Sequence, residues 1–137
     1  MSSAGPTASD GGSYENSARL RVSVGPLAGP LLSRVVSIVA ARADCPVDRL
    51  DETLIVCETL SAYAPAHVPN GHVGLRVDAR RDRIGLCIGP LVSRGGRALI
   101  ADASVPGVGN VLERIADELA VETAQDGSEA LRLEMRF

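Results

Sequence analysis

Glu58 is the residue of this sequence whose type and position most suggest chemistry. It lies in a stretch, residues 47–63, whose apolar residues recur at helical spacing. Positions three and four apart share one face of a helix, so Glu58 lies beside Ile55 and Ala62 and is expected to point toward apolar surroundings. Because an unpaired buried carboxylate is costly, a chain seldom keeps one without a reason, and Glu58 is a candidate functional residue. The alternative is an acid at the helix edge with its carboxylate in water.

Other residues could bind ligands. Gly107 and Gly109 precede an apolar, helix-like stretch, and N–H groups at such a position can bind phosphate, although a turn and helix cap need the same glycines. Arg94–Arg97, with two central glycines, could contact a phosphate or form a mobile polar loop. His67 and His72 flank a turn without a neighbouring acid or cysteine, so we expect exposed loop residues rather than metal ligands.

The remaining reactive side chains do not form a recognisable catalytic pattern. Ser33 and Ser61 lie on predicted helices without His and Asp partners at a suitable spacing. Cys45, Cys57 and Cys87 are odd in number and lack the Cys-x-x-Cys spacing, which argues against a disulfide framework and against a zinc site. We therefore expect no metal centre.

The composition narrows the classes of partner. A net charge of −3 and a pI near 5.3, with dispersed arginines and only 2% aromatic residues, argue against nucleic-acid binding. No apolar run has the length of a membrane span, and the first residues lack a secretion signal. We expect a cytoplasmic protein of 137 residues with an aliphatic core.

The first half of the chain predicts a tail, a strand, two helices and a hairpin. Residues 1–16, rich in Ser, Gly, Ala and Pro, read as a disordered tail, and residues 17–137 as one domain. Alternation predicts a strand at 18–24, and Pro30 suits the first turn of a helix that ends near residue 44. The second helix is 47–63, with an expected apolar stripe of Leu50, Leu54, Cys57 and Ser61. Residues 73–79 and 84–88 alternate around a polar turn, which predicts a hairpin, and Pro90 is expected to end its second strand.

The second half is less regular. Residues 91–107 predict a long connection with one short element. A third helix is expected at 108–119, followed by strands at 119–124 and 130–137. This order predicts an α/β (α+β) two-layer sandwich, with a mixed, mostly antiparallel sheet and three helices on one face.

Taken together, these elements resemble a known fold. Residues 26–36 match its first helix, 47–62 its second, 82–88 a central strand, and 107–117 the start of its last helix. Over residues 18–137 the chain resembles the Bergerat-type (GHKL, histidine-kinase-like) ATPase fold. Within that fold it resembles the small anti-sigma regulatory factors that are also serine-protein kinases.

The resemblance implies a nucleotide site whose motifs are degenerate here. In the family, a helical Glu acts as a base or orients water, and an Asn four residues later holds Mg²⁺; the matching positions are Glu58 and Ala62. An Asp that binds the adenine amino group falls at Pro90, or at Gly89 if the alignment shifts by one. The family's Gly-x-Gly motif is retained as Gly107 and Gly109.

Three functions follow from this resemblance. The first is an anti-sigma-factor-like regulatory protein that acts by protein–protein binding, needs no cofactor, and has lost its nucleotide site. Its partners would be a sigma factor or an anti-sigma antagonist, and a second copy of the chain. The second copy would bind through the first helix or through a sheet edge, for which the strand at residues 20–24 is the candidate. The alternative is a serine/threonine-protein kinase that binds ATP and Mg²⁺ through Glu58, Gly107–Gly109 and Arg94–Arg97. A small-molecule or phosphotransfer module using the same cleft is a third.

Overall fold

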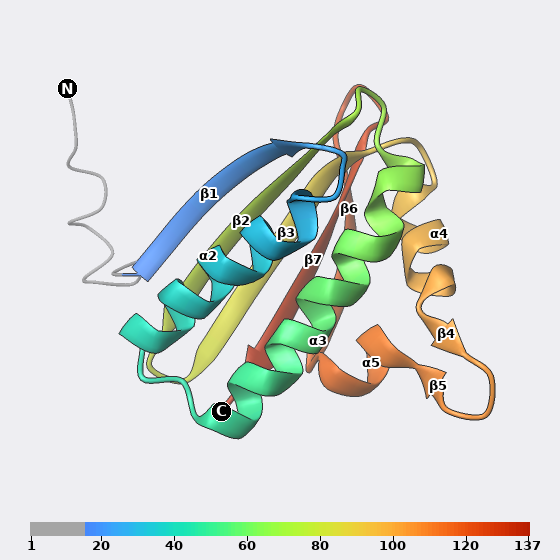
Figure 1. The fold of residues 1–137 in the computed structure, drawn as a ribbon. Helices are drawn as coiled ribbons and strands as arrows, with labels where there is room; N and C mark the ends of the chain where they lie inside the picture. Colours follow the sequence, from blue (N-terminus) through green and yellow to red (C-terminus); the bar gives the residue numbers. More distant parts are fainter. Residues whose placement is uncertain (1–15) are drawn as a thin grey trace, which may run out of the picture.

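The computed structural model of this protein describes residues 16–137 (Figure 1). Residues 1–15, most of the predicted tail, lie outside the described residues. Asn16, which we had assigned to that tail, is the first residue of strand β1. The helices are α2 (Ala28–Arg42), α3 (Val47–Tyr63), α4 (Gly95–Asp102) and α5 (Val111–Ile115), with a 3-10 turn η1 (Ala64–His67). The strands are β1 (Asn16–Ser23), β2 (His72–Arg80), β3 (Arg83–Leu91), β4 (Ser104–Val105), β5 (Gly109–Asn110), β6 (Glu118–Thr123) and β7 (Glu129–Arg136).

Five strands form one sheet in the order β1-β2-β3-β7-β6, and β4 pairs only with β5. Every pairing is antiparallel, so the expectation of a mixed sheet is corrected. Antiparallel strands can be joined by short turns, as at residues 81–82 between β2 and β3. The helices lie on one side of the sheet (Figure 1). The predicted two-layer sandwich is therefore confirmed.

Strand alternation separates the two faces of the sheet. On β2, Val73, Leu75 and Val77 are at most 4% exposed, whereas Arg76 between them is exposed. The strands β3 and β7 repeat the pattern, and their inward residues join the buried faces of α2 and α3 in one aliphatic core. Among residues 16–137, no helix lies on the other face of the sheet, which we call the open face.

Residues 91–119 differ most from expectation. The short element expected in the connection after β3 is the helix α4, so residues 16–137 contain four α-helices where we expected three. The third helix, predicted at 108–119, is only the five residues of α5, because Gly109 and Asn110 form β5 and Glu118 begins β6. The Asn110 side chain accepts a hydrogen bond from the N–H of Glu113 at 3.1 Å and so fixes the start of α5.

Helix α3 has the predicted bounds but a different buried face. Its buried residues are Thr53, Val56, Cys57 and Leu60, whereas Leu50 and Leu54, from the predicted stripe, are half-buried. Thr53 can be buried because its hydroxyl donates to the carbonyl of Arg49 at 2.8 Å. The core-facing side is thus turned away from the predicted one, with consequences for Glu58.

Candidate functional site

Glu58 and Ala62 lie on the solvent side of α3. Both residues are exposed, and Ile55 on the same face is 46% exposed. The expectation that Glu58 points toward apolar surroundings is therefore wrong, and the alternative of a carboxylate in water is correct. The reason is the turned helix face, because Val56, Cys57 and Leu60 take the core positions. Ala62 presents only a methyl group, which cannot ligate a cation.

Pro90 lies near the end of β3 rather than after it. The strand continues to Leu91, which is fully buried, while Pro90 is exposed and follows Gly89 through a cis peptide bond. The pairing with β7 shifts register between Ile88 and Leu91, and this irregularity accommodates a residue without an N–H. Neither Gly89 nor Pro90 supplies a carboxylate for an adenine amino group.

Gly107 and Gly109 lie in the hairpin that joins β4 to β5. Both have positive φ, +80° and +108°, a conformation that favours glycine, so the turn itself explains them. The helix that follows begins only at Val111, is five residues long, and is capped by Asn110. The hairpin is fixed to α4 by the Asn110 amide, which donates to the carbonyl of Ile100 at 2.7 Å. The structure therefore supports the turn-and-cap interpretation of this motif.

The N-terminus of α4 is occupied by a carboxylate of the chain itself. Glu129 accepts hydrogen bonds from the N–H groups of Arg94 at 3.0 Å and Gly96 at 2.9 Å. Gly95 and Gly96 are buried, and a Cβ on Gly96 would lie 2.7 Å from the Val121 side chain. The Arg94–Arg97 segment is thus the packed start of a helix, and the expectations of a mobile loop and of a free phosphate site are both corrected.

His67 is held by an acid that is distant in sequence. Its Nε2 lies 2.7 Å from Oδ2 of Asp102 at the end of α4, and the His67 carbonyl accepts from the N–H of Val92 at 2.7 Å. Our expectation of an exposed His67 without an acidic partner is therefore wrong. Asp102 is 35 residues away, so no local spacing could reveal the pair. His72 starts β2, and its Nδ1 lies 3.0 Å from the Asn70 carbonyl oxygen.

The structure does not assemble the predicted nucleotide residues into one site. A cavity with a volume of about 750 Å³ lies on the open face. Gly89 and Pro90 line it, whereas Glu58, Ala62, Gly107 and Gly109 do not. In the described part of the chain, no three His, Cys, Asp or Glu side chains are grouped to hold a metal ion. No described helix is long and apolar enough to cross a membrane.

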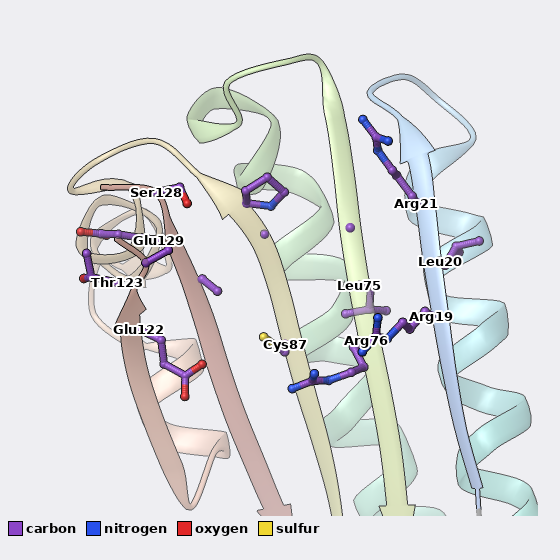
Figure 2. Close-up of a pocket in the computed structure, with 15 residues that line it drawn as sticks. Arg19, Leu20, Arg21, Leu75, Arg76, Cys87, Glu122, Thr123, Ser128 and Glu129 are labelled. Atoms are coloured by element: carbon purple, nitrogen blue, oxygen red, sulfur yellow. The ribbon is translucent and has the colours of Figure 1, made fainter. Parts of the chain in front are cut away.

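The cavity is a trough that crosses the strands. Its floor is formed by Gly74 and Gly89, which face each other in the β2–β3 pairing, and by Ala130 on β7. A Cβ on Gly74 would lie 2.6 Å from the Gly89 carbonyl oxygen, so the two backbones approach closely. Arg21 on β1 and Glu122 on β6 stand at opposite ends (Figure 2).

A row of longer side chains forms one wall of the trough. Arg19 pairs with Arg76, Arg76 with Cys87, and Cys87 with Arg132 in the strand registers. Figure 2 shows Arg76 beside Cys87 in the middle of the sheet. Burial raises the pKa of the Cys87 thiol, with Arg76 lowering it less, which disfavours the reactive thiolate form.

Some charged side chains on the open face form ion pairs and others do not. Arg132 forms an ion pair with Glu122 at 2.9 Å, and Arg83 one with Glu134 at 3.4 Å. Within residues 16–137, Arg19, Arg21 and Arg76 form no salt bridge or side-chain hydrogen bond. Sequence reasoning missed this cluster, because its members come from two strands more than 50 positions apart.

A second exposed feature lies on the helical layer. Leu27, Leu31 and Ile38, at the start of α2 and along it, are 72%, 45% and 54% exposed. The helix packs beside β1, where the Arg42 side chain donates to Asn16 at 3.3 Å. Strand β1 is an edge of the sheet, as the sequence predicted. We call these three residues together with the free edge of β1 the α2–β1 surface.

Comparisons with known proteins do not assign this chain to a family. A scan against protein-family models found no match. A search of the curated proteins also found none.

Proposed function

We propose that this protein is an anti-sigma-factor-like regulator that acts by protein–protein binding through the α2–β1 surface and has no nucleotide-dependent step. It works in the cytoplasm, with a sigma factor or an anti-sigma antagonist as its partner, and it can pair with a second copy of itself. The assignment to this class rests on the order and spacing of the elements that resemble that family.

The exposed apolar stripe of α2 is the observation that carries the proposal. Leu27, which immediately precedes α2, and Leu31 and Ile38 within α2 are 45–72% exposed. The exposed Arg34 lies between Leu31 and Ile38 on the same face. The three apolar side chains flank a sheet edge that has no neighbouring strand in the described residues. Grouped apolar side chains and free strand edges are both features of protein-binding surfaces.

The state of the family's motifs supports binding without ATP. Ala62 has no oxygen for Mg²⁺, and Gly89 and Pro90 have no acceptor side chain for adenine. The Gly96 N–H at the start of α4 already binds Glu129. Each lost contact to a charged or buried polar group costs about 1.5–3 kcal/mol, so two losses weaken binding by about two to four orders of magnitude.

Calorimetry with Mg·ATP tests the nucleotide half of the proposal. We expect no saturable binding in the low micromolar range, with or without Mg²⁺. A low micromolar dissociation constant, or phosphate transferred from ATP to a serine of a partner, would contradict the proposal and support the serine/threonine kinase alternative.

Binding to purified sigma factors and antagonist proteins from the same genome tests the other half. Leu27→Asp and Ile38→Lys should each weaken the complex at least tenfold. Both changes place a charge that suits its end of the helix, so α2 should remain folded. Ala62→Lys, on an exposed position of α3 and so outside the α2–β1 surface, is the control. Equal binding by all three variants would show that the α2–β1 surface is not the contact.

A further inference from the structure

The trough on the open face adjoins the β1 edge but contains none of Leu27, Leu31 and Ile38, and it has the form of a ligand site. Its volume of about 750 Å³ lies within the range of small-molecule pockets. The depth comes from missing side chains, because Gly74 and Gly89 sit where the adjacent row has Arg76 and Cys87. Close backbone contact makes this floor hard to fill, since a Cβ on Gly74 would meet a carbonyl oxygen at 2.6 Å.

The trough is cationic at one end only. Arg19, Arg21 and Arg76 line it from β1 and β2 and form no ion pair within residues 16–137. At the β6 end, Glu122 is paired with Arg132. Three neighbouring guanidinium groups repel one another, and their planar donors match the two oxygens of a carboxylate or phosphate. An anion is therefore favoured at the β1 end and disfavoured beside Glu122.

The floor of the trough can contact the apolar part of a ligand. From β2 across β3 to β7 it spans two strand spacings, which is about 10 Å. Its members, Gly74, Gly89 and Ala130, offer backbone and one methyl group but no charge. We propose that the trough binds a small amphiphilic organic anion, with its carboxylate or phosphate at Arg19, Arg21 and Arg76 and an apolar chain over the glycine floor toward β7.

Calorimetric titration of the full chain with decanoate and with decyl phosphate tests this site. We expect saturable binding of one molecule per chain to at least one of the two, and at least tenfold weaker binding of decyltrimethylammonium, which has the same chain and the opposite charge. Binding of either anion supports the site, and their comparison identifies the preferred head group.

Variants locate the site. Arg19→Gln, Arg21→Gln and Arg76→Gln should each weaken binding of the better anion about tenfold, the loss expected for one charged hydrogen-bonding contact. Arg34→Gln, on an exposed position of α2 in the other layer, is the matched control. Ala130→Phe should abolish binding by filling the floor, whereas Ala120→Phe, on the same face outside the cavity, should not. Unchanged melting temperatures establish that each variant is folded.

Three results would overturn the inference. The first is equal binding of the decyl anions and decyltrimethylammonium, which indicates only apolar adsorption. The second is anion binding unaffected by all three arginine variants and by Ala130→Phe. The third is absence of saturable binding by either decyl anion while an acidic Glu–Leu decapeptide binds, which would make the open face a protein-docking surface. None of these results tests Leu27, Leu31 or Ile38, on which the proposed function rests.

Discussion

The two faces of the five-stranded sheet carry different kinds of residue, although the same strands build both. On β2, Val73, Leu75 and Val77 face the helices and are nearly inaccessible, whereas Gly74, Arg76 and Asp78 alternate with them on the open face. The covered face is uniformly aliphatic. The open face carries glycine, which has no side chain, together with charged residues of both signs.

This difference separates stability from recognition. Burial of aliphatic area is the main favourable contribution to folding, so the covered face determines whether the chain folds. Exposed ion pairs such as Arg132–Glu122 contribute little to stability. The open face is therefore free to vary in shape and charge, which are properties that a ligand or partner recognises.

The largest expected effect compares neighbouring residues on the two faces of β3. Ile88 is fully buried, and Ile88→Ala should lower the free energy of unfolding by about 2–5 kcal/mol through lost burial and the resulting cavity. Cys87→Ala, one residue away on the open face, should change it by less than about 1 kcal/mol. Urea unfolding of both variants measures the difference. Similar losses would show that the open face also contributes to the core.

Gly74 lies on the open face, but we expect its substitution to destabilise the protein. Gly74→Ala places a Cβ about 2.6 Å from the Gly89 carbonyl oxygen, which is backbone and cannot move aside easily. We expect a loss of about 1–3 kcal/mol in the free energy of unfolding, as for other overpacked sites. Gly25→Ala is the control, because a Cβ there meets nothing within 4 Å. A fully stable Gly74→Ala protein would mean that β2 and β3 can separate without cost.

The covered face of the sheet could be predicted from the sequence, because the patterns that indicate it occur among residues close together in the chain. Alternation on β2, β3 and β7 and the apolar periodicity of α2 and α3 predicted the two layers and the hairpin. The error at α3 arose from choosing Leu50 and Leu54 as the core stripe over Thr53 and Val56. Thr53 reads as polar in a sequence, and only its hydrogen bond to the Arg49 carbonyl makes it a core residue.

The candidate site could not be predicted for the opposite reason. The arginine cluster, the Glu129 contact with the start of α4, and the His67–Asp102 pair join residues 33–57 positions apart. Such contacts follow from strand order and register, which short-range periodicity does not encode. The Gly107–Gly109 motif is a local pattern that is easily recognised in the sequence, but the structure explains its glycines by the β4–β5 hairpin and not by a phosphate site.

Asp117 and Asp78 have pKa values shifted in opposite directions, so they should affect the pH dependence of stability in opposite senses. The backbone N–H of Arg136 lowers the pKa of Asp117, which also pairs with Arg49. A depressed folded-state pKa gives stability that is present above the unfolded value of about 3.9 and lost as pH falls through the folded value. Asp117→Asn should therefore cost up to about 1 kcal/mol at pH 7, given solvent screening, and less in acid.

Asp78, on the open face, should behave in the opposite sense. Burial raises the pKa of its carboxyl against the lowering effect of Arg76 and Arg80. Stability therefore falls as pH rises from about 3.9 through the folded-state value, and Asp78→Asn should stabilise the protein at pH 7 but not in acid. Thermal unfolding between pH 3 and pH 7 measures both variants. Parallel pH profiles for the two would contradict the assigned causes.

The smallest expected effect is at Glu58, where the sequence first suggested chemistry. Its side chain is exposed, no hydrogen bond or ion pair of it was found in residues 16–137, and Ala62 one turn later cannot hold a metal near it. A base with no positioned substrate has nothing to activate. Glu58→Gln should therefore leave the free energy of unfolding within about 0.5 kcal/mol of the parent and partner binding nearly unchanged. Glu52→Gln, which removes an ion pair with Arg49 on the same helix, is the matched control and should have the larger, though still small, effect on stability. If Glu58→Gln abolished function in a folded protein while Glu52→Gln did not, Glu58 would be chemically active despite its exposure, and the kinase alternative would replace the binding proposal.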